Sequence, residues 1–174
     1  MYCAGSLVSS RFLLTAAHCF ARASPTEFSL VVGSERAGLA AGPGRQVRRI
    51  KRLISRKDFD VRTYDNDLAL VEMDRPVRQP CRAAQIFDKH VPKVEFSRWV
   101  RPVCLPDKNE DYADRLATVM GWGRLEQGGQ LPDTLQAARV RVWQQQECRQ
   151  SSSHRPSEIT DNMVGLTSIN GIFI

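Results

Sequence analysis

Short apolar segments separated by glycine, proline and polar turns are the feature that most constrains the fold of this 174-residue chain. Segments of this kind, bounded by turn residues, are typical of antiparallel sandwiches and barrels. We therefore predict an all-β protein, with a hairpin at its start and a short helix beginning near 144–149. The expected strands lie at residues 3–8, 12–15, 28–32, 47–54, 67–73, 117–123 and 135–143.

Composition places the chain among folded proteins, because 42% of its residues are hydrophobic and 25% are charged. A double barrel usually needs roughly 200–250 residues, so this chain is short for one. The 25 basic and 19 acidic residues leave a net charge of +6, which without a binding motif does not indicate nucleic acid. We expect no membrane span, since the sequence has no apolar run of about 18 residues. Its first residues are too short and uncharged a segment for a signal peptide.

The five cysteines are an odd number, so at least one is free or pairs outside this sequence. The sequence contains no Cys-x2-Cys or His-x3-His pair, and we predict neither a metal nor a cofactor. Disulfides in an oxidising compartment are the better interpretation of the cysteine content.

Two side chains, His18 and Asp67, are candidates for acid–base chemistry. A neutral imidazole, with an ordinary pKa of about 6.5, can accept a proton from a hydroxyl nucleophile at physiological pH. Such a base needs its second ring nitrogen held by an acceptor, usually a buried carboxylate. Asp67 begins an apolar strand, so its carboxylate should be poorly solvated and point at a partner. Taken singly, each residue has an ordinary structural explanation, as a core histidine or a turn aspartate.

The strings around these two residues carry a family resemblance. LTAAHC (14–19), DLAL (67–70) and GWG (121–123), in this order, resemble the chymotrypsin/trypsin-like serine endopeptidases. Weaker strings extend the likeness over residues 3–164. The resemblance implies a trypsin-like antiparallel double β-barrel with an active site in the cleft between the barrels. It also implies that His18 is the general base, that Asp67 is its orienting acid, and that Cys3 and Cys19 form a disulfide.

The resemblance is incomplete at both ends. The family's nucleophile motif, a serine preceded by Gly-Asp and followed by Gly-Gly, does not occur in the sequence. We therefore expect no catalytic serine or oxyanion hole, a first barrel that lacks its first strand, and a truncated second barrel. Residues 1–164 would be a partial peptidase domain and 165–174 an unrelated tail. The serines at 151–153 are not expected to replace the nucleophile, because no glycine-rich turn surrounds them to supply oxyanion donors.

A segment at 78–94 interrupts the family pattern and is predicted to be an insertion. It carries Cys81 and His90, for which no third or fourth metal ligand is evident. A splice boundary explains it better than a functional loop. Cys104 and Cys148 resemble family cysteines whose partners are absent here, so with Cys81 they would leave three unpaired thiols.

Between residues 36 and 57 the chain holds eight basic residues and no acidic one. Its centre is spaced like a twisted edge strand and forms a candidate polyanion patch of Arg48, Arg49, Lys51 and Arg52. A solvated strand face explains the same charges. The lack of carboxylates argues against a calcium loop.

Three functions follow from these features. The first is a partial trypsin-like serine endopeptidase, which cuts protein or peptide substrates in its full-length form and is inactive as given. The alternative is a non-catalytic protease-like module that binds a polyanion or a partner. The third is a non-productive isoform, whose open barrel would expose unpaired strand edges. The resemblance implies an extracellular location.

Overall fold

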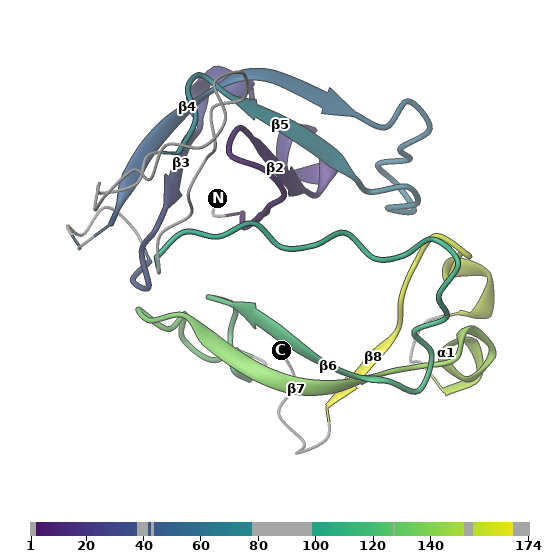
Figure 1. Cartoon of the computed structure of the whole chain (residues 1–174). Helices are drawn as coiled ribbons and strands as arrows, with labels where there is room; N and C mark the ends of the chain where they lie inside the picture. The colour runs from purple at the N-terminus through teal and green to yellow at the C-terminus, as the bar shows by residue number, and fades with distance from the viewer. Residues whose placement is uncertain are drawn as a thin grey trace. The chain divides into compact units, whose positions relative to one another are not determined.

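The structure, a computed structural model, describes residues 3–37, 42, 44–77, 99–126, 128–151 and 155–168. Within these residues it has eight strands, one α-helix and three short 3₁₀ helices, which confirms the all-β prediction. The chain divides into two compact units (Figure 1). The first comprises Met1–Ser34, Leu39–Arg56 and Leu68–Leu105, and the second comprises Glu35–Gly38, Lys57–Asp67 and Pro106–Ile174.

The first unit is built on a five-stranded antiparallel sheet in the order β1-β2-β5-β4-β3. Its strands are β1 (Ser6–Leu7), β2 (Phe12–Thr15), β3 (Ser29–Val32), β4 (Gln46–Ser55) and β5 (Ala69–Met73). Figure 1 shows β2, β5, β4 and β3 as neighbouring ribbons. Each strand lies within one of the segments expected from the sequence, apart from the first and last residues of β4.

The core of the first unit lies against β5, the middle strand of this sheet. Val71 and Met73 are both 0% exposed, and Met73 packs in a cluster with Val77 and Val100. Full burial of one such side chain stabilises the folded state by about 1.5–3 kcal/mol. A strand that is buried on both faces has a nearly continuous run of apolar residues. This run is why the sequence predicted a strand at residues 67–73.

Strand β4 differs from the expected edge strand, because it lies between β3 and β5. Its first four residues pair with β3, and its later residues pair with β5. The register shifts between Ile50 and Arg52, and such a bulge bends and twists a strand locally. The sequence pattern was irregular because each half of β4 has its own partner.

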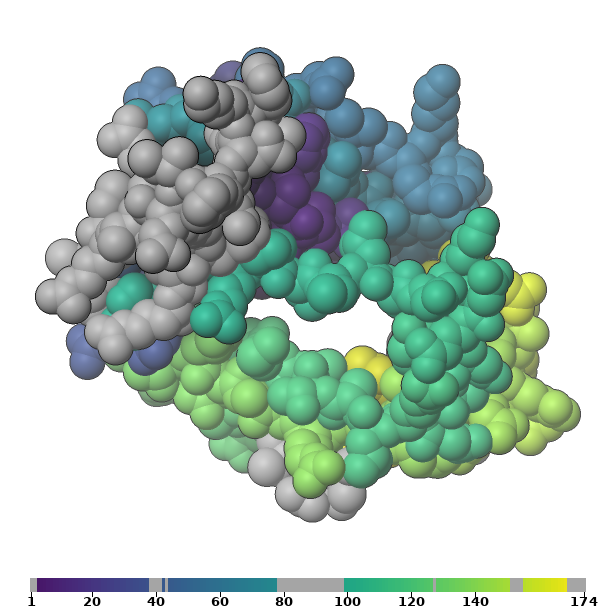
Figure 2. Space-filling model, viewed as in Figure 1, coloured from purple at the N-terminus to yellow at the C-terminus, as the bar shows by residue number. Residues whose placement is uncertain are grey.

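The second unit contains a three-stranded antiparallel sheet in the order β6-β7-β8. These strands are β6 (Leu116–Gly121), β7 (Gln136–Val142) and β8 (Leu166–Ser168). In the space-filling view the side chains of β6 and β7 form a continuous green surface (Figure 2). Strand β8 belongs to the stretch that the sequence assigned to an unrelated tail, and it pairs with β7 through Val140, Arg141 and Val142.

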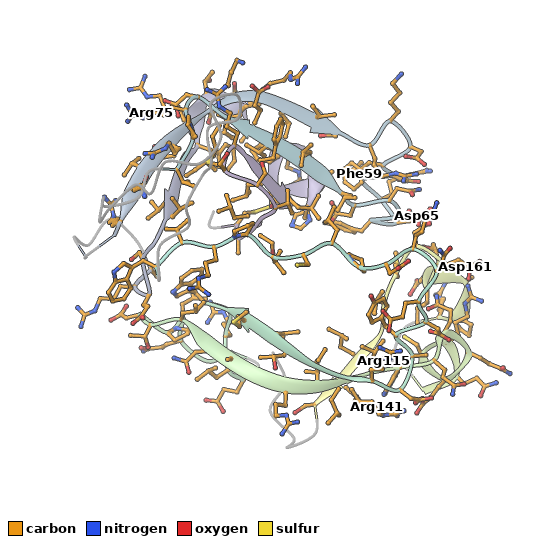
Figure 3. The ribbon with its side chains drawn as sticks, viewed as in Figure 1. Phe59, Asp65, Arg75, Arg115, Arg141 and Asp161 are labelled. Atoms are coloured by element: carbon orange, nitrogen blue, oxygen red, sulfur yellow. A yellow bond between two sulfur atoms is a disulfide. The ribbon has the colours of Figure 1, made fainter. Side chains whose placement is uncertain are left out.

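Helix α1 (Gln145–Ser151) follows β7 and is held to it by an arginine. Arg141 of β7, labelled in Figure 3, donates to Glu147 Oε1 of α1 at 2.7 Å and to Asp114 Oδ1 at 2.5 Å. Its neighbours raise the pKa of Arg141 further, chiefly through the hydrogen bond to Glu147. Among the helices of the described residues, none combines the length and apolar character required to cross a bilayer.

The buried thiol of Cys148 in α1 packs against Gly165, the residue before β8. Cys148 is 8% exposed and free, and Cys104 is free and exposed. The prediction that these two thiols are unpaired is therefore confirmed, whereas Cys81 lies outside the described residues. A Cβ atom at position 165 would lie against Cys148 Sγ and 2.9 Å from Cys148 Cβ. Glycine is what allows this close approach.

Two other expectations also fall outside the described residues. They are the insertion at 78–94, with Cys81 and His90, and two of the three serines at 151–153, Ser152 and Ser153. Both stay predictions.

We expect the substitution Gly165→Cys to form a disulfide with Cys148 on oxidative refolding. The Cβ atoms of a disulfide are about 3.5–4.5 Å apart, so the two segments need to separate by only about 1 Å. Closing a loop of this size should raise the free energy of unfolding by about 3 kcal/mol, less any packing strain. Thiol titration and thermal unfolding, with and without reductant, measure both effects.

The matched control is Gly121→Cys, because among the described residues the atom nearest to a Cβ there is Gly123 N, at 3.8 Å. That variant should gain one titratable thiol. An equal gain in Gly165→Cys would contradict the expected bond.

Candidate active site

His18 lies directly after the hairpin formed by β1 and β2. The hairpin pairs Ser6 with Leu14 and Leu7 with Leu13. His18 then belongs to the 3₁₀ helix Ala17–Phe20, and its carbonyl accepts a hydrogen bond from the Ala21 N–H at 3.2 Å. The histidine is therefore held by a short helical turn that the hairpin positions.

A disulfide between Cys3 and Cys19 ties the start of the hairpin to this turn, as predicted. Cys19 is 4% exposed, and its Sγ lies 4.0 Å from His18 Nε2. The hydroxyl of Thr15 donates to the Ala4 carbonyl at 2.7 Å beside the disulfide. The Cys3–Cys19 disulfide and the Thr15–Ala4 hydrogen bond therefore both restrain the backbone next to His18.

Asp67 ends the loop 57–67, whose backbone is unusual. Tyr64 and Asn66 have φ angles of 59° and 57°, in the left-handed region that non-glycine residues seldom adopt. Hydrogen bonds hold this conformation, from Tyr64 N to Asp60 O at 2.8 Å and from Asp60 N to Asp65 O at 3.1 Å. Backbone strain of this kind costs about 1–3 kcal/mol per residue and is concentrated at functional sites.

The Asp65 carboxylate anchors this loop within the second unit. Asp65 Oδ1 accepts hydrogen bonds from Thr160 Oγ1 at 2.5 Å and from Asn162 Nδ2 at 3.0 Å. Figure 3 shows Asp65 close to Asp161, the chain neighbour of both donors. The hydrogen bond from Thr160, followed by that from Asn162, lowers the pKa of Asp65 from its ordinary value of 3.8. Sequence reasoning missed this anchor, whose only signal was the string ITDNMV at 159–164.

The two candidate catalytic residues belong to different units. His18 lies in the first unit and Asp67 in the second, and their pairing stays a prediction. The first unit does pair Thr15 of β2 with Ala69 of β5. His18 follows Thr15 by three residues, and Asp67 precedes Ala69 by two.

The four basic residues of the candidate patch do not share one environment. Arg48 is 5% exposed, and its guanidinium donates twice to the Pro76 carbonyl, at 3.2 and 3.0 Å. Arg49, Lys51 and Arg52 are exposed. Arg48 therefore supports the fold from inside the unit, while the other three present their charge at the surface.

Lys51 and Arg52 share one carboxylate, that of Glu72 on β5. Lys51 Nζ lies 2.7 Å from Glu72 Oε1, and Arg52 Nε lies 3.1 Å from Glu72 Oε2. The hydrogen bond from Lys51 is the main cause that lowers the pKa of Glu72 below its ordinary value. Glu72 thus neutralises part of the positive charge that the sequence concentrates on β4.

Comparison with known proteins places the chain among the trypsins. The Trypsin family model matches residues 1–171. The chain is 32% identical over 148 residues to Serine protease filzig of Drosophila melanogaster, covering 85% of this chain and 8% of that protein. It is 34% identical to Ovochymase-2 of Mus musculus, covering 84% and 22%, and 32% identical to Transmembrane protease serine 9 of Rattus norvegicus, covering 93% and 13%.

Among solved structures, one described as the structure of GrC matches with a TM-score of 0.72 and 25% sequence identity. The match covers 95% of this chain and 63% of that chain. The chain therefore spans less than a quarter of the length of these curated relatives and under two thirds of the solved protein.

We expect Asp65→Ala to destabilise the second unit near neutral pH, because Thr160 and Asn162 lose their shared acceptor. A carboxylate whose pKa is lowered in the folded state contributes its full stabilisation of the fold at pH values above its unfolded-state pKa of 3.8. That contribution is lost as the pH falls through the folded-state pKa. The difference between wild type and variant in denaturant midpoint should accordingly be largest near neutrality and vanish in acid.

Asp161→Ala is the matched control, since its side chain is 85% exposed and pairs only with Arg149 among the interactions described. Hydrogen exchange at the Asp60 and Tyr64 amides reports the loop directly. Equal protection of these amides in wild type and Asp65→Ala would refute the anchoring role.

Proposed function

The chain belongs to the trypsin family of serine proteases, and we propose that His18 and Asp67 are the general base and orienting acid of its proteolytic site. The all-β fold and the match to the GrC structure agree with the trypsin-like fold expected from the sequence. Proteolysis is the activity of this family, and its substrates are proteins.

The observation that supports the pairing is the register of β2 against β5. Thr15 and Ala69 are direct partners in an antiparallel pair. Such strands run in opposite directions, so the residues after Thr15 and those before Ala69 leave the same end of the pair. Two residues span at most about 7 Å, which keeps Asp67 near that end. His18 begins its turn from the same place.

In this assignment His18 accepts the proton of an attacking serine and returns it to the leaving amine. Asp67 holds the imidazole in the tautomer whose Nε2 is free to act as base and stabilises the imidazolium that forms. The 174 residues contain no Gly-Asp-Ser-Gly-Gly string. We propose that this chain alone hydrolyses no peptide bond, and that proteolysis belongs to a longer form acting on protein or peptide substrates.

An extracellular location agrees with the chemistry of the hairpin. The Cys3–Cys19 disulfide is a bond that persists in oxidising compartments. Because its Cys19 half is buried beside the proposed base, the disulfide would restrain the histidine only where it stays oxidised. We therefore propose that the protein works outside the cytosol.

The Asp67→Asn variant tests the pairing without requiring a nucleophile. Nitrogen NMR should find the neutral His18 ring protonated at Nδ1 in wild type and shifted toward the Nε2-protonated tautomer in Asp67→Asn. The other two of the three histidines serve as internal controls, and His18→Asn assigns the signal. A fluorophosphonate probe should label no serine in any of these proteins.

An unchanged His18 tautomer in Asp67→Asn would contradict the pairing. Stoichiometric labelling of a serine in the wild-type chain would contradict the proposed inactivity. The two results are independent, so either part of the assignment can fail alone.

A second candidate function, polyanion binding, rests on the three exposed cations of β4. The side chains of Lys51 and Arg52 are 55% and 62% exposed although both contact Glu72. Arg49 is also exposed, and only its backbone N–H is used by Asp74 Oδ1, at 3.1 Å. Sulfate or phosphate groups could therefore approach all three cations, with Glu72 as the opposing charge.

Heparin affinity measured against salt concentration tests this candidate. Replacing Arg49, Lys51 and Arg52 by Gln should weaken binding and flatten its salt dependence, because fewer counterions are released. Arg139→Gln on β7, also exposed, is the single-charge control. Equal affinity and salt slope in the triple variant and wild type would exclude β4 as the binding surface.

A further inference from the structure

The chain enters Asp67 from Asn66, a residue with a left-handed backbone. The φ angle of Asn66 is 57°, in a region that only glycine and, less often, asparagine and aspartate adopt routinely. We propose that Asn66 is a positioning residue of the proteolytic site, because its backbone conformation and its side-chain amide fix the direction in which the loop 57–67 delivers Asp67. The inference rests on the proposed function of Asp67, and it adds a residue that takes no part in proton transfer itself.

The conformation of Asn66 matters because this residue immediately precedes the proposed acid. Each residue has only two soft backbone dihedral angles, and these set the direction of the next peptide unit. A change of Asn66 from the left-handed to the right-handed region would therefore redirect the Asp67 side chain. A displacement of about 1 Å at a catalytic site can cost about 100-fold in rate, so the conformation of residue 66 is a functional constraint as well as a structural one.

Two hydrogen bonds of the Asn66 side chain hold this conformation from within the loop. Asn66 Nδ2 donates to the Asp58 carbonyl at 3.4 Å and to Asp65 Oδ2 at 3.2 Å. The side chain is half-buried, and a hydrogen bond is electrostatically stronger there than in water. The amide therefore ties the residue before Asp67 both to the start of the loop and to its carboxylate anchor.

The Asp65 carboxylate connects Asn66 to a distant segment of the second unit. Its Oδ2 accepts the hydrogen bond from Asn66, whereas its Oδ1 accepts those from Thr160 and Asn162. A carboxylate is planar, so its two oxygens cannot move independently. The donors at 160 and 162 thus restrain Asn66 through one rigid group.

Helix α1 holds the segment that carries these two donors. Gln145 Nε2 donates to the Thr160 carbonyl at 2.5 Å, and Arg149 Nε donates to the Ile159 carbonyl at 3.0 Å. Ile159 is 8% exposed, so burial fixes the segment as well. The anchor of Asp65 is therefore itself supported, as a precisely placed functional side chain requires.

Asp114 has the same construction as Asn66 at a place that leads to no proposed catalytic residue. Its φ angle is 62°, and it lies shortly before β6. Its carboxylate accepts hydrogen bonds from Arg141 Nη1 at 2.5 Å and from Gln144 Nε2 at 2.5 Å. Asp114 is thus a left-handed residue held by its own side chain in the same unit, and it supplies a matched control.

Nitrogen NMR of His18 in the full 174-residue chain tests the inference. Alanine adopts the left-handed region less readily than asparagine and carries no amide. Asn66→Ala should therefore lower the ratio of the Nδ1-protonated to the Nε2-protonated tautomer several-fold. Asn66→Gly keeps the backbone conformation accessible, and its ratio should lie between those of wild type and Asn66→Ala. Asp114→Ala should lower the denaturant midpoint but leave the tautomer ratio at the wild-type value.

Comparison with Asp67→Asn separates the failure of this inference from that of the proposed function. An unchanged tautomer in Asp67→Asn would remove both the pairing and the role of Asn66. A shift in Asp67→Asn with a wild-type ratio in Asn66→Ala would overturn the role of Asn66 alone. An equal shift in Asp114→Ala would do the same, because general loss of stability would then be the cause.

Should Asn66→Ala fail to fold, Thr160→Val tests the same contacts from their far end. This substitution removes the hydroxyl that donates to Asp65 Oδ1 and changes the shape of the side chain little. We expect a shift of the His18 tautomer in the same direction as in Asp67→Asn. A wild-type ratio in Thr160→Val would then overturn the inference.

Discussion

The antiparallel pairing of β2 with β5 is the contact on which the first unit depends. It joins residues 12–15 to residues 69–73 across more than fifty intervening positions, matching Leu13 with Val71 and Leu14 with Leu70. Leu13 is 9% exposed and Val71 fully buried, so a slip of one residue would turn apolar side chains to solvent. The same register sets where the chain segments bearing His18 and Asp67 leave the sheet.

The second unit restrains the other proposed catalytic segment by different means. Every residue of the loop 57–67 is exposed or half-buried, and polar bonds to Asp65 anchor it. Left-handed backbone at Tyr64 and Asn66 is tolerated because hydrogen bonds from Thr160 and Asn162 over-determine the position of the carboxylate between them.

Charge is distributed more evenly in space than along the chain. In the sequence, residues 36–57 include eight basic residues and no acidic one. In the sheet, these cations meet carboxylates and carbonyls contributed by later residues, with Glu72 beside Lys51 and Arg52 and the Pro76 carbonyl beside Arg48. Burying a guanidinium is costly unless its donors are paired, and Arg48 meets that condition with backbone acceptors.

Local pattern was sufficient for seven of the eight strands and for the family, but it predicted no strand at β8. Alternation and turn residues placed β3, β6 and β7 to within a residue or two, because the period of side chains in a strand is a property of adjacent residues. The strings around His18, Asp67 and Gly121 pointed to the trypsins, and the Cys3–Cys19 disulfide followed from that likeness. What the tertiary structure alone decided are contacts between distant residues: the burial of Arg48, the clamp of Asp65 by Thr160 and Asn162, and the packing of Cys148 on Gly165. Each depends on which strands pair and in what register, and that choice is made by the whole core at once rather than by any short stretch of the chain.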